Sequence, residues 1–204
     1  MNNPADFLNS SYTTPVDKRS DAGQIETWVV DDLYYPKWKN FLSIFDDYNE
    51  YHRNAGGGYK FYKTNMEYPT DIDPNLDLHA FIRFELQNLP IDIGQFKKAW
   101  GLKYPPGGYS GLHTHTPGKQ LTAILFLDDC IVDINSPLAG NLITLQPTED
   151  NSIQYLTHPT EAGKMVIMDG RVFHGTYPTT NERKVFVIDF DYTPTLTFDT
   201  TNAV

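Results

Sequence analysis

From residue 96 onward, apolar and polar residues alternate in short segments that Gly, Pro and Asp residues separate. Such alternation places successive side chains on opposite faces of a β-strand. It predicts strands at residues 96–104, 112–116, 121–128, 141–146, 153–157, 164–169, 171–177 and 183–192. Short strands at this spacing, with turn residues between them, favour an antiparallel double-sheet jelly roll.

The segment before residue 96 follows a mixed pattern. Residues 25–33 and 59–65 have the composition of strands, whereas residues 35–54 and 75–89 have apolar residues at helical spacing. The stretch AGGG after residue 54 is a typical helix end, as is Pro90. We therefore predict a mainly β protein with flanking helices, an α+β arrangement built on a jelly-roll core.

These patterns divide one domain into four parts. We expect a loose N-terminal arm over 1–24, a helical front with short strands over 25–95, the β core over 96–192 and a loose tail over 193–204. The chain has 204 residues, of which 40% are hydrophobic, enough to bury a sizeable core. The oligomeric state stays open, because a free edge strand can pair two chains.

The charge and the termini narrow the expected partners. The net charge is −10 and no block of Lys and Arg occurs, so we expect neither nucleic acid nor an anionic membrane surface as a partner. The start of the chain lacks the pattern of a signal peptide, and the longest apolar run, at 123–127, is too short to span a bilayer. A cytoplasmic location is therefore expected, with the single cysteine, Cys130, as a buried and inert thiol.

Three histidines and an arginine carry the candidate chemistry. His113 and His115 lie two residues apart, so a regular strand would point both imidazoles to one side, where they could bind a metal ion. The alternative is a pair of solvated loop residues. His174 follows an apolar strand and an Asp-Gly turn, which offers a third imidazole. Arg183 opens an apolar strand, where a buried guanidinium needs an anionic partner such as a carboxylate.

Three segments resemble a known family: LKYPPGGYSGLHTH, LTAILFLDD and GKMVIMDGRVFHGTYPTTNERKVFVIDFDY. They are similar to the iron(II)- and 2-oxoglutarate-dependent oxygenases, in particular to the prolyl-hydroxylase-like branch and to small bacterial and phage members. The resemblance covers roughly residues 96–192. It implies a double-stranded β-helix as the catalytic core, with iron(II), 2-oxoglutarate and O2 as cofactor and cosubstrates.

The resemblance also implies roles for individual residues. His113 and His174 match the family's metal ligands, and Arg183 matches the basic residue that anchors 2-oxoglutarate. Lys184 is the neighbouring candidate for that anchor, but strand alternation lets only one of the two point inward, and we favour Arg183. Tyr104 matches a strand tyrosine that contacts the cosubstrate, although a half-buried sheet tyrosine would have the same pattern.

The chain departs from the family pattern at one position. Most members have an aspartate two residues after the first histidine, where this chain has His115. Three neutral imidazoles leave iron(II) with its full +2 charge, whereas two histidines and one carboxylate leave +1. We expect His115 to be the third ligand, the alternative being a water in that place.

The implied reaction is hydroxylation of an unidentified substrate, a peptidyl residue or a small metabolite, with release of succinate and CO2. Two other functions remain open on the sequence. One is a cupin-like dioxygenase with three histidines on iron and no 2-oxoglutarate, in which Arg183 would hold a substrate carboxylate. The other is a non-enzymatic, structural jelly roll with H-x-H on its surface. Succinate formation distinguishes the 2-oxoglutarate-dependent oxygenase from the cupin-like dioxygenase. Metal retention that depends on His113 or His174 would count against the structural jelly roll.

Overall fold

The computed structural model describes residues 27–30, 48–53, 59–64, 91–115, 120–147 and 152–194. Within these ranges the chain forms eleven strands, all paired antiparallel, and no helix. Residues 27–30, 48–53 and 59–64 pair into the same sheet as the strands from residue 91 onward. The strands therefore belong to one structural unit.

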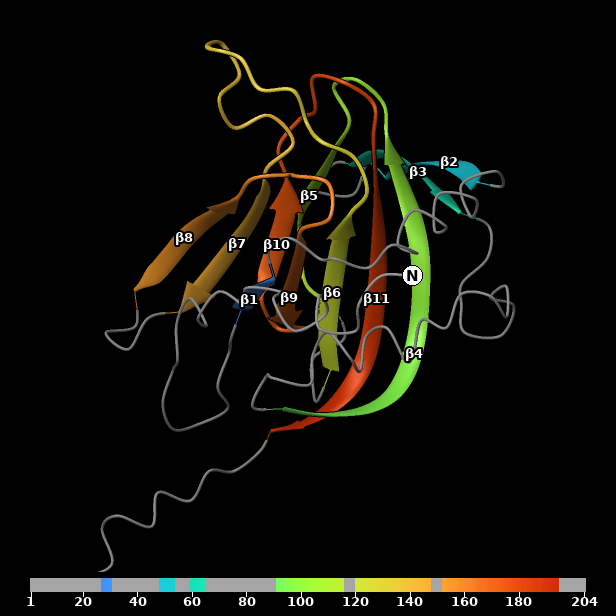
Figure 1. Cartoon of the computed structure of the whole chain (residues 1–204), viewed down its shortest axis with the longest axis vertical. Coiled ribbons are helices and arrows are strands. Elements are labelled where there is room, and N and C mark those ends of the chain that lie inside the picture. Colours follow the sequence, from blue (N-terminus) through green and yellow to red (C-terminus); the bar gives the residue numbers. More distant parts are fainter. Residues whose placement is uncertain are drawn as a thin grey trace, which may run out of the picture.

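The strands form two layers that share one edge. One layer has the order β1 (Thr27–Val30), β9 (Met165–Asp169), β6 (Gln120–Phe126), β11 (Arg183–Pro194) and β4 (Ile91–Tyr104). The other has the order β5 (Tyr109–His113), β10 (Phe173–Thr176), β7 (Leu142–Pro147) and β8 (Ile153–His158). Strand β3 (Tyr59–Thr64) pairs with both β4 and β5 and so joins the layers, and β2 (Tyr48–Arg53) pairs with β3. In Figure 1 strands β6, β11 and β4 run side by side, while β10, β7 and β8 form a group at the left.

Burial along the strands explains their sequences. Strands β6 and β9 are buried on both faces over most of their length, which matches their nearly continuous apolar runs AILF and MVIM. Strands β5 and β8 alternate between more and less buried positions. The central core cluster lies between the layers and includes Trp100, Ile124, Phe126, Val166 and Val185. The predicted jelly-roll core is confirmed.

All eight strands predicted from residue 96 onward occur, with shifted ends. The largest shift is in β4, which begins at Ile91 and pairs with β11 along its length, from Arg183↔Tyr104 to Pro194↔Ile91. The predicted strands at 25–33 and 59–65 correspond to β1 and β3. Hydrogen bonding to a neighbouring strand, rather than local composition, sets where each strand stops.

The helix predicted over 35–54 is wrong at its C-terminal end. Residues 48–53 form β2, which pairs with β3 from Tyr48↔Thr64 to Arg53↔Tyr59. His52 therefore lies on a strand, not at the end of a helix. A ladder of backbone hydrogen bonds to β3 outweighs the weak helical spacing of the side chains, because propensity is easily overridden by tertiary pairing. The rest of that helix and the one predicted at 75–89, with His79, lie outside the described residues.

Other expectations have mixed outcomes. Cys130 is half-buried rather than buried, because β6 ends at Phe126 and the chain leaves the sheet before it. Its thiol makes two weak contacts, 3.9 Å from the Ile131 carbonyl oxygen and 3.9 Å from the Thr180 hydroxyl. No helix in the described part of the chain is long and apolar enough to cross a membrane. The arm at 1–24 lies outside the described residues, and the four-part division stays a prediction.

Candidate metal centre

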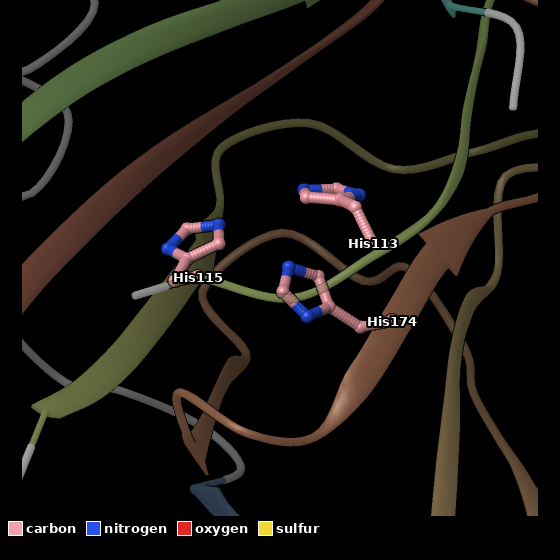
Figure 2. Close-up of side chains that lie close together, drawn as sticks. All are labelled: His113, His115 and His174. Carbon is pink, nitrogen blue, oxygen red and sulfur yellow. The ribbon is translucent and has the colours of Figure 1, made fainter. Parts of the chain in front are cut away.

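Three imidazoles meet at one point between the two layers. His113 ends β5 and His174 lies on β10, and the two residues are direct partners in the strand pairing. Their ring centroids are 4.4 Å apart, and His115 lies 5.5 Å from His113 and 4.9 Å from His174. One ring nitrogen of each histidine lies within 4.8 Å of the others, and Figure 2 shows the three rings directed toward one another. The structure thus brings together all three predicted metal ligands.

His115 reaches this point from outside the strand on which it was predicted. Strand β5 runs over 109–113 rather than 112–116, so His115 lies beyond its end. The backbone N–H of His115 donates to the Gly170 carbonyl oxygen at 3.0 Å, which ties the chain after β5 to the connection between β9 and β10. His113 and His115 therefore converge at the end of β5 and not within a regular strand.

Each imidazole has its Nδ1 atom engaged by the protein. His113 Nδ1 lies 2.8 Å from the Gly111 carbonyl oxygen, and His174 Nδ1 lies 3.0 Å from the Val172 carbonyl oxygen. His115 Nδ1 lies 2.7 Å from an oxygen of the Asp189 carboxylate. Because carbonyl and carboxylate oxygens only accept, each Nδ1 carries the proton and each neutral ring has its lone pair on Nε2. That tautomer is the one that binds a metal through Nε2.

Burial keeps the central imidazole neutral. Only 2% of His174 is exposed, and burial lowers its pKa well below the ordinary value. The neighbouring rings of His113 and His115 lower that pKa further, because three cations this close together would repel one another. Metal ions bind the neutral imidazole, so the site holds His174 in its ligand form at neutral pH.

The imidazoles line a cavity of about 410 Å³ between the layers. Alternate residues of two paired strands form one of its walls: Lys98, Trp100, Leu102 and Tyr104 of β4, and Arg183, Val185, Val187 and Asp189 of β11. The opposite wall includes His113 of β5 and His174 of β10. The histidines therefore line a space large enough for small ligands, which argues against a surface pair on a structural protein.

Arg183 lies in this cavity as a buried cation. Its side chain is 1% exposed, and burial lowers its pKa below the ordinary value. Its NH1 atom donates to the Thr160 hydroxyl at 2.9 Å, whereas its Nε has no hydrogen-bond partner. The guanidinium carbon lies 4.8 Å from the centre of the Tyr104 ring. No carboxylate among the described residues forms an ion pair with Arg183, so the side chain retains the capacity to bind an anion.

The neighbouring candidates differ in their surroundings. Lys184 does not line the cavity, and its ammonium lies 3.8 Å from a carboxylate oxygen of Glu182. Tyr104 does line the cavity, is 3% exposed, and has its hydroxyl 2.7 Å from the Ser110 hydroxyl. Of the two adjacent cations, the geometry therefore favours Arg183, as expected from the sequence.

Asp189, which contacts His115, was not among the site residues predicted from the sequence. Counting alternate positions from Arg183 would have found it, because residues 183, 185, 187 and 189 share the inner face of β11. A carboxylate on an apolar inner face is unusual enough to mark a site. His158 lies at the end of β8 outside the cavity lining, with its Nε2 3.0 Å from the Thr144 hydroxyl.

This donor set fits iron(II) and a carboxylate ligand. Imidazole nitrogens suit iron, zinc, copper and nickel, and three of them converge from one side. The buried guanidinium with an unpartnered Nε suits a carboxylate in the same cavity. The residues present can therefore hold a metal ion and an anionic ligand together.

No model of a known protein family matches the chain, and no curated protein matches its sequence. Solved structures with similar folds were found. A prolyl-4-hydroxylase from Pseudomonas putida is 14% identical, with a TM-score of 0.58 over 92% of this chain and 95% of that one. A prolyl hydroxylase from Trichoplax adhaerens, solved with a peptide of the hypoxia inducible factor oxygen degradation domain, is 11% identical, with a TM-score of 0.59 over 81% and 83%.

A third similar structure is an oxidoreductase of the 2OG-Fe(II) oxygenase family from Burkholderia pseudomallei. It is 12% identical, with a TM-score of 0.57 over 81% of this chain and 84% of that one. Likeness at this level of identity establishes a shared fold. The double-stranded β-helix expected from the sequence is therefore confirmed.

Proposed function

We propose that the protein is an iron(II)- and 2-oxoglutarate-dependent oxygenase that hydroxylates its substrate. The observation that carries this proposal is the pairing, in one cavity, of three convergent imidazoles with a buried arginine whose Nε has no partner. A metal ion alone would explain the histidines, but not the cost of burying Arg183 without an anion. The similar folds of prolyl hydroxylases support the same function.

Each residue has a distinct part in this proposal. Bound iron(II) and 2-oxoglutarate supply the oxygen chemistry, in which 2-oxoglutarate becomes succinate and CO2 while the substrate is hydroxylated. His113, His115 and His174 hold the metal through Nε2. Arg183 binds the far carboxylate of 2-oxoglutarate, and the hydroxyl of Tyr104 lies on the same side of the cavity.

The apolar walls of the cavity have a separate effect. Leu102, Ile124, Phe126, Val185 and Val187 line the same cavity as Arg183 and the imidazoles and lower the polarity of its walls. In such a space the attraction between Arg183 and a carboxylate is stronger than in bulk water. The dianionic cosubstrate also offsets the +2 charge that three neutral imidazoles leave on iron.

For the substrate we infer a peptidyl residue as the first candidate and a small metabolite as the second. The first rests on analogy with the fold neighbours, one of which was solved with a peptide. The expected partners are thus a small-molecule cosubstrate and one of these substrates.

A second function is favoured by one observation, the lack of a carboxylate among the three clustered ligands. Three histidines on a jelly roll can hold iron for a dioxygenase that uses no 2-oxoglutarate. Arg183 would then bind a carboxylate of the substrate itself. Succinate formation distinguishes the two functions, because only the first produces it.

The test is an anaerobic titration with iron(II) followed by 2-oxoglutarate, monitored for the visible metal-to-ligand charge-transfer band. We expect a band in the wild type and in Lys184→Ala, but none at the same concentrations in Arg183→Ala or His174→Ala. Succinate release in air follows as the second measurement. Tight iron binding without a band or succinate would refute the proposal in favour of the dioxygenase without 2-oxoglutarate.

A further inference from the structure

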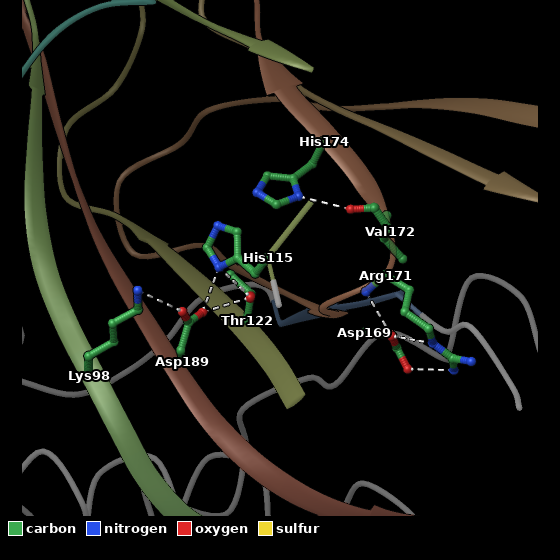
Figure 3. A network of polar contacts seen from close by, with 8 residues as sticks. All are labelled: Lys98, His115, Thr122, Asp169, Arg171, Val172, His174 and Asp189. Carbon is green, nitrogen blue, oxygen red and sulfur yellow. Dashed lines mark hydrogen bonds and ion pairs between the residues drawn. The ribbon is translucent and has the colours of Figure 1, made fainter. Parts of the chain in front are cut away.

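His115 is held differently from the other two imidazoles of the site. The Nδ1 atoms of His113 and His174 donate to backbone carbonyls two residues earlier in the chain. The Nδ1 atom of His115 lies 2.7 Å from Asp189 Oδ1 and 2.9 Å from the Thr122 hydroxyl, both distant in sequence. Figure 3 shows this network beside the bond from His174 to Val172. His115 also occupies the position where the family pattern has a carboxylate. The imidazole with different hydrogen-bond partners is therefore the one that replaces the usual aspartate.

Three paired strands align the groups around His115. Asp189 on β11 is the register partner of Thr122 on β6 and of Lys98 on β4. The Thr122 hydroxyl donates to Asp189 Oδ1 at 2.8 Å, and the Lys98 ammonium lies 4.0 Å from Asp189 Oδ2. Asp189 is 1% exposed and its Oδ2 has no hydrogen-bond partner. Burying a carboxylate here costs free energy unless the surrounding donors and cations stabilise its charge.

We propose that Asp189 is a positioning residue that supplies, across the imidazole ring from the metal, a negative charge in place of the one that His115 removes from the ligand set. As a carboxylate it holds the proton on His115 Nδ1, directs Nε2 toward the metal and makes the ring a stronger donor. The metal is then held by two neutral imidazoles and one imidazole that shares its proton with a carboxylate. The inference rests on the metal site of the proposed function and on no step of its reaction.

The register of the sheet explains how a carboxylate from another strand can support a histidine in the position of the usual aspartate. Asp189 and His115 belong to segments far apart in sequence, and the pairing of β11 with β6 places Asp189 opposite Thr122, whose hydroxyl contacts both groups. Trp100 stacks on the ring of His115, with its ring centroid 5.7 Å from that of His115 and an angle of 29° between the planes. His115 therefore has its orientation constrained by a carboxylate at one edge and an indole across its face.

The test measures metal affinity, not turnover. Cobalt(II) is titrated into the apoprotein by competition with a chelator, and its visible ligand-field spectrum is recorded. We expect Asp189→Asn to bind cobalt(II) about 10–100-fold more weakly, because loss of an outer-shell partner has that effect. The matched control is Asp191→Asn on the same strand: Asp191 forms an ion pair with Lys97 at 2.8 Å, is 41% exposed, and does not line the cavity. We expect this control to bind as the wild type does.

A double-mutant comparison shows whether Asp189 acts through His115. In a His115→Ala background, Asp189→Asn is expected to leave cobalt(II) affinity unchanged, since the ring that it positions is gone. Thr122→Val keeps the shape of the side chain and provides the readout if Asp189→Asn does not fold. It is expected to weaken affinity less than Asp189→Asn does, and wild-type affinity and spectrum in Thr122→Val would then count against the network.

Two outcomes overturn the inference. One is equal affinity of Asp189→Asn and the wild type with an unchanged spectrum, and the other is an equal loss in the His115→Ala background. Failure of the proposed function gives a different result: cobalt(II) binds in an Asp189-dependent manner, but 2-oxoglutarate neither binds nor is converted. A wild-type protein that binds no metal would overturn both.

Discussion

The substitution Arg183→Met distinguishes the effect of a buried cation on the stability of the apoprotein from its effect on the binding of 2-oxoglutarate. Methionine has no charge and extends about as far as the arginine Nε, so it fills only part of the space beside Tyr104 and Phe126, whose ring centres lie 4.8 and 5.7 Å from the guanidinium carbon. Without ligand, the substitution removes a fully buried charge that no carboxylate in the described residues pairs with. We expect the apoprotein to be as stable as the wild type or more stable, because replacing buried charges with apolar side chains is often neutral or adds about 1–4 kcal/mol.

When 2-oxoglutarate is present, we expect the wild type to gain more stability than the variant. Loss of two charge-assisted hydrogen bonds removes roughly 3 kcal/mol of binding free energy, about a 100-fold loss of affinity. At a 2-oxoglutarate concentration of about 100 times the wild-type Kd, binding stabilises the wild type by roughly 2.7 kcal/mol, or about 5–10 °C in Tm. The same concentration only reaches the Kd of the variant, which gives roughly 0.4 kcal/mol and about 1–2 °C.

The assay is thermal unfolding with manganese(II) in place of iron, with and without 2-oxoglutarate, so that no turnover occurs. Lys184→Met is the matched control, because its side chain lies next in sequence but does not line the cavity. The reasoning would be refuted by a variant that keeps the full shift induced by 2-oxoglutarate. If Lys184→Met lost the shift instead, Lys184 would be the anchor.

Three further predictions concern ligation, pH and packing. His174→Ala should weaken metal binding more than the roughly 10–100-fold that loss of an outer partner costs, and unchanged affinity in a chelator competition would remove His174 from the ligand set. Burial, and then the charge of Lys164, lower the pKa of His158 to about 4, so the unfolded chain binds a proton more readily below pH 6.5. Stability should fall by about 3 kcal/mol as the pH drops from 6.5 to 4, and urea unfolding of His158→Gln should show a shallower fall; identical slopes would contradict this assignment. At Gly175, an added Cβ would lie 2.9 Å from the Ser110 carbonyl oxygen. Gly175→Ala should therefore lower the free energy of unfolding by about 1–3 kcal/mol and weaken metal binding by separating β10 from β5. Wild-type unfolding and metal affinity in this variant would show that the strands can adjust.

The strand content of the core was readable from the sequence because alternation is a local property. Segments such as 121–128 and 183–192 bury alternate or continuous apolar residues wherever they lie in the fold, so their periodicity survives tertiary context. The same reasoning failed at 48–53, where the side chains have helical spacing but the backbone pairs with β3. Which partner satisfies a backbone hydrogen bond is not encoded by spacing along one segment.

The ligand types were likewise evident in the sequence, and their arrangement was not. H-x-H, a distant histidine and a strand-opening arginine indicated a metal and an anion by their chemistry alone. The choice of Arg183 over Lys184 depended on which face of β11 turns inward, and in the folded sheet Arg183 lines the cavity whereas Lys184 does not. The contact of Asp189 with His115 depended on register between β11 and β6. Local chemistry is carried by residue type, whereas the meeting of residues 74 positions apart requires the pairing of distant strands in the folded sheet.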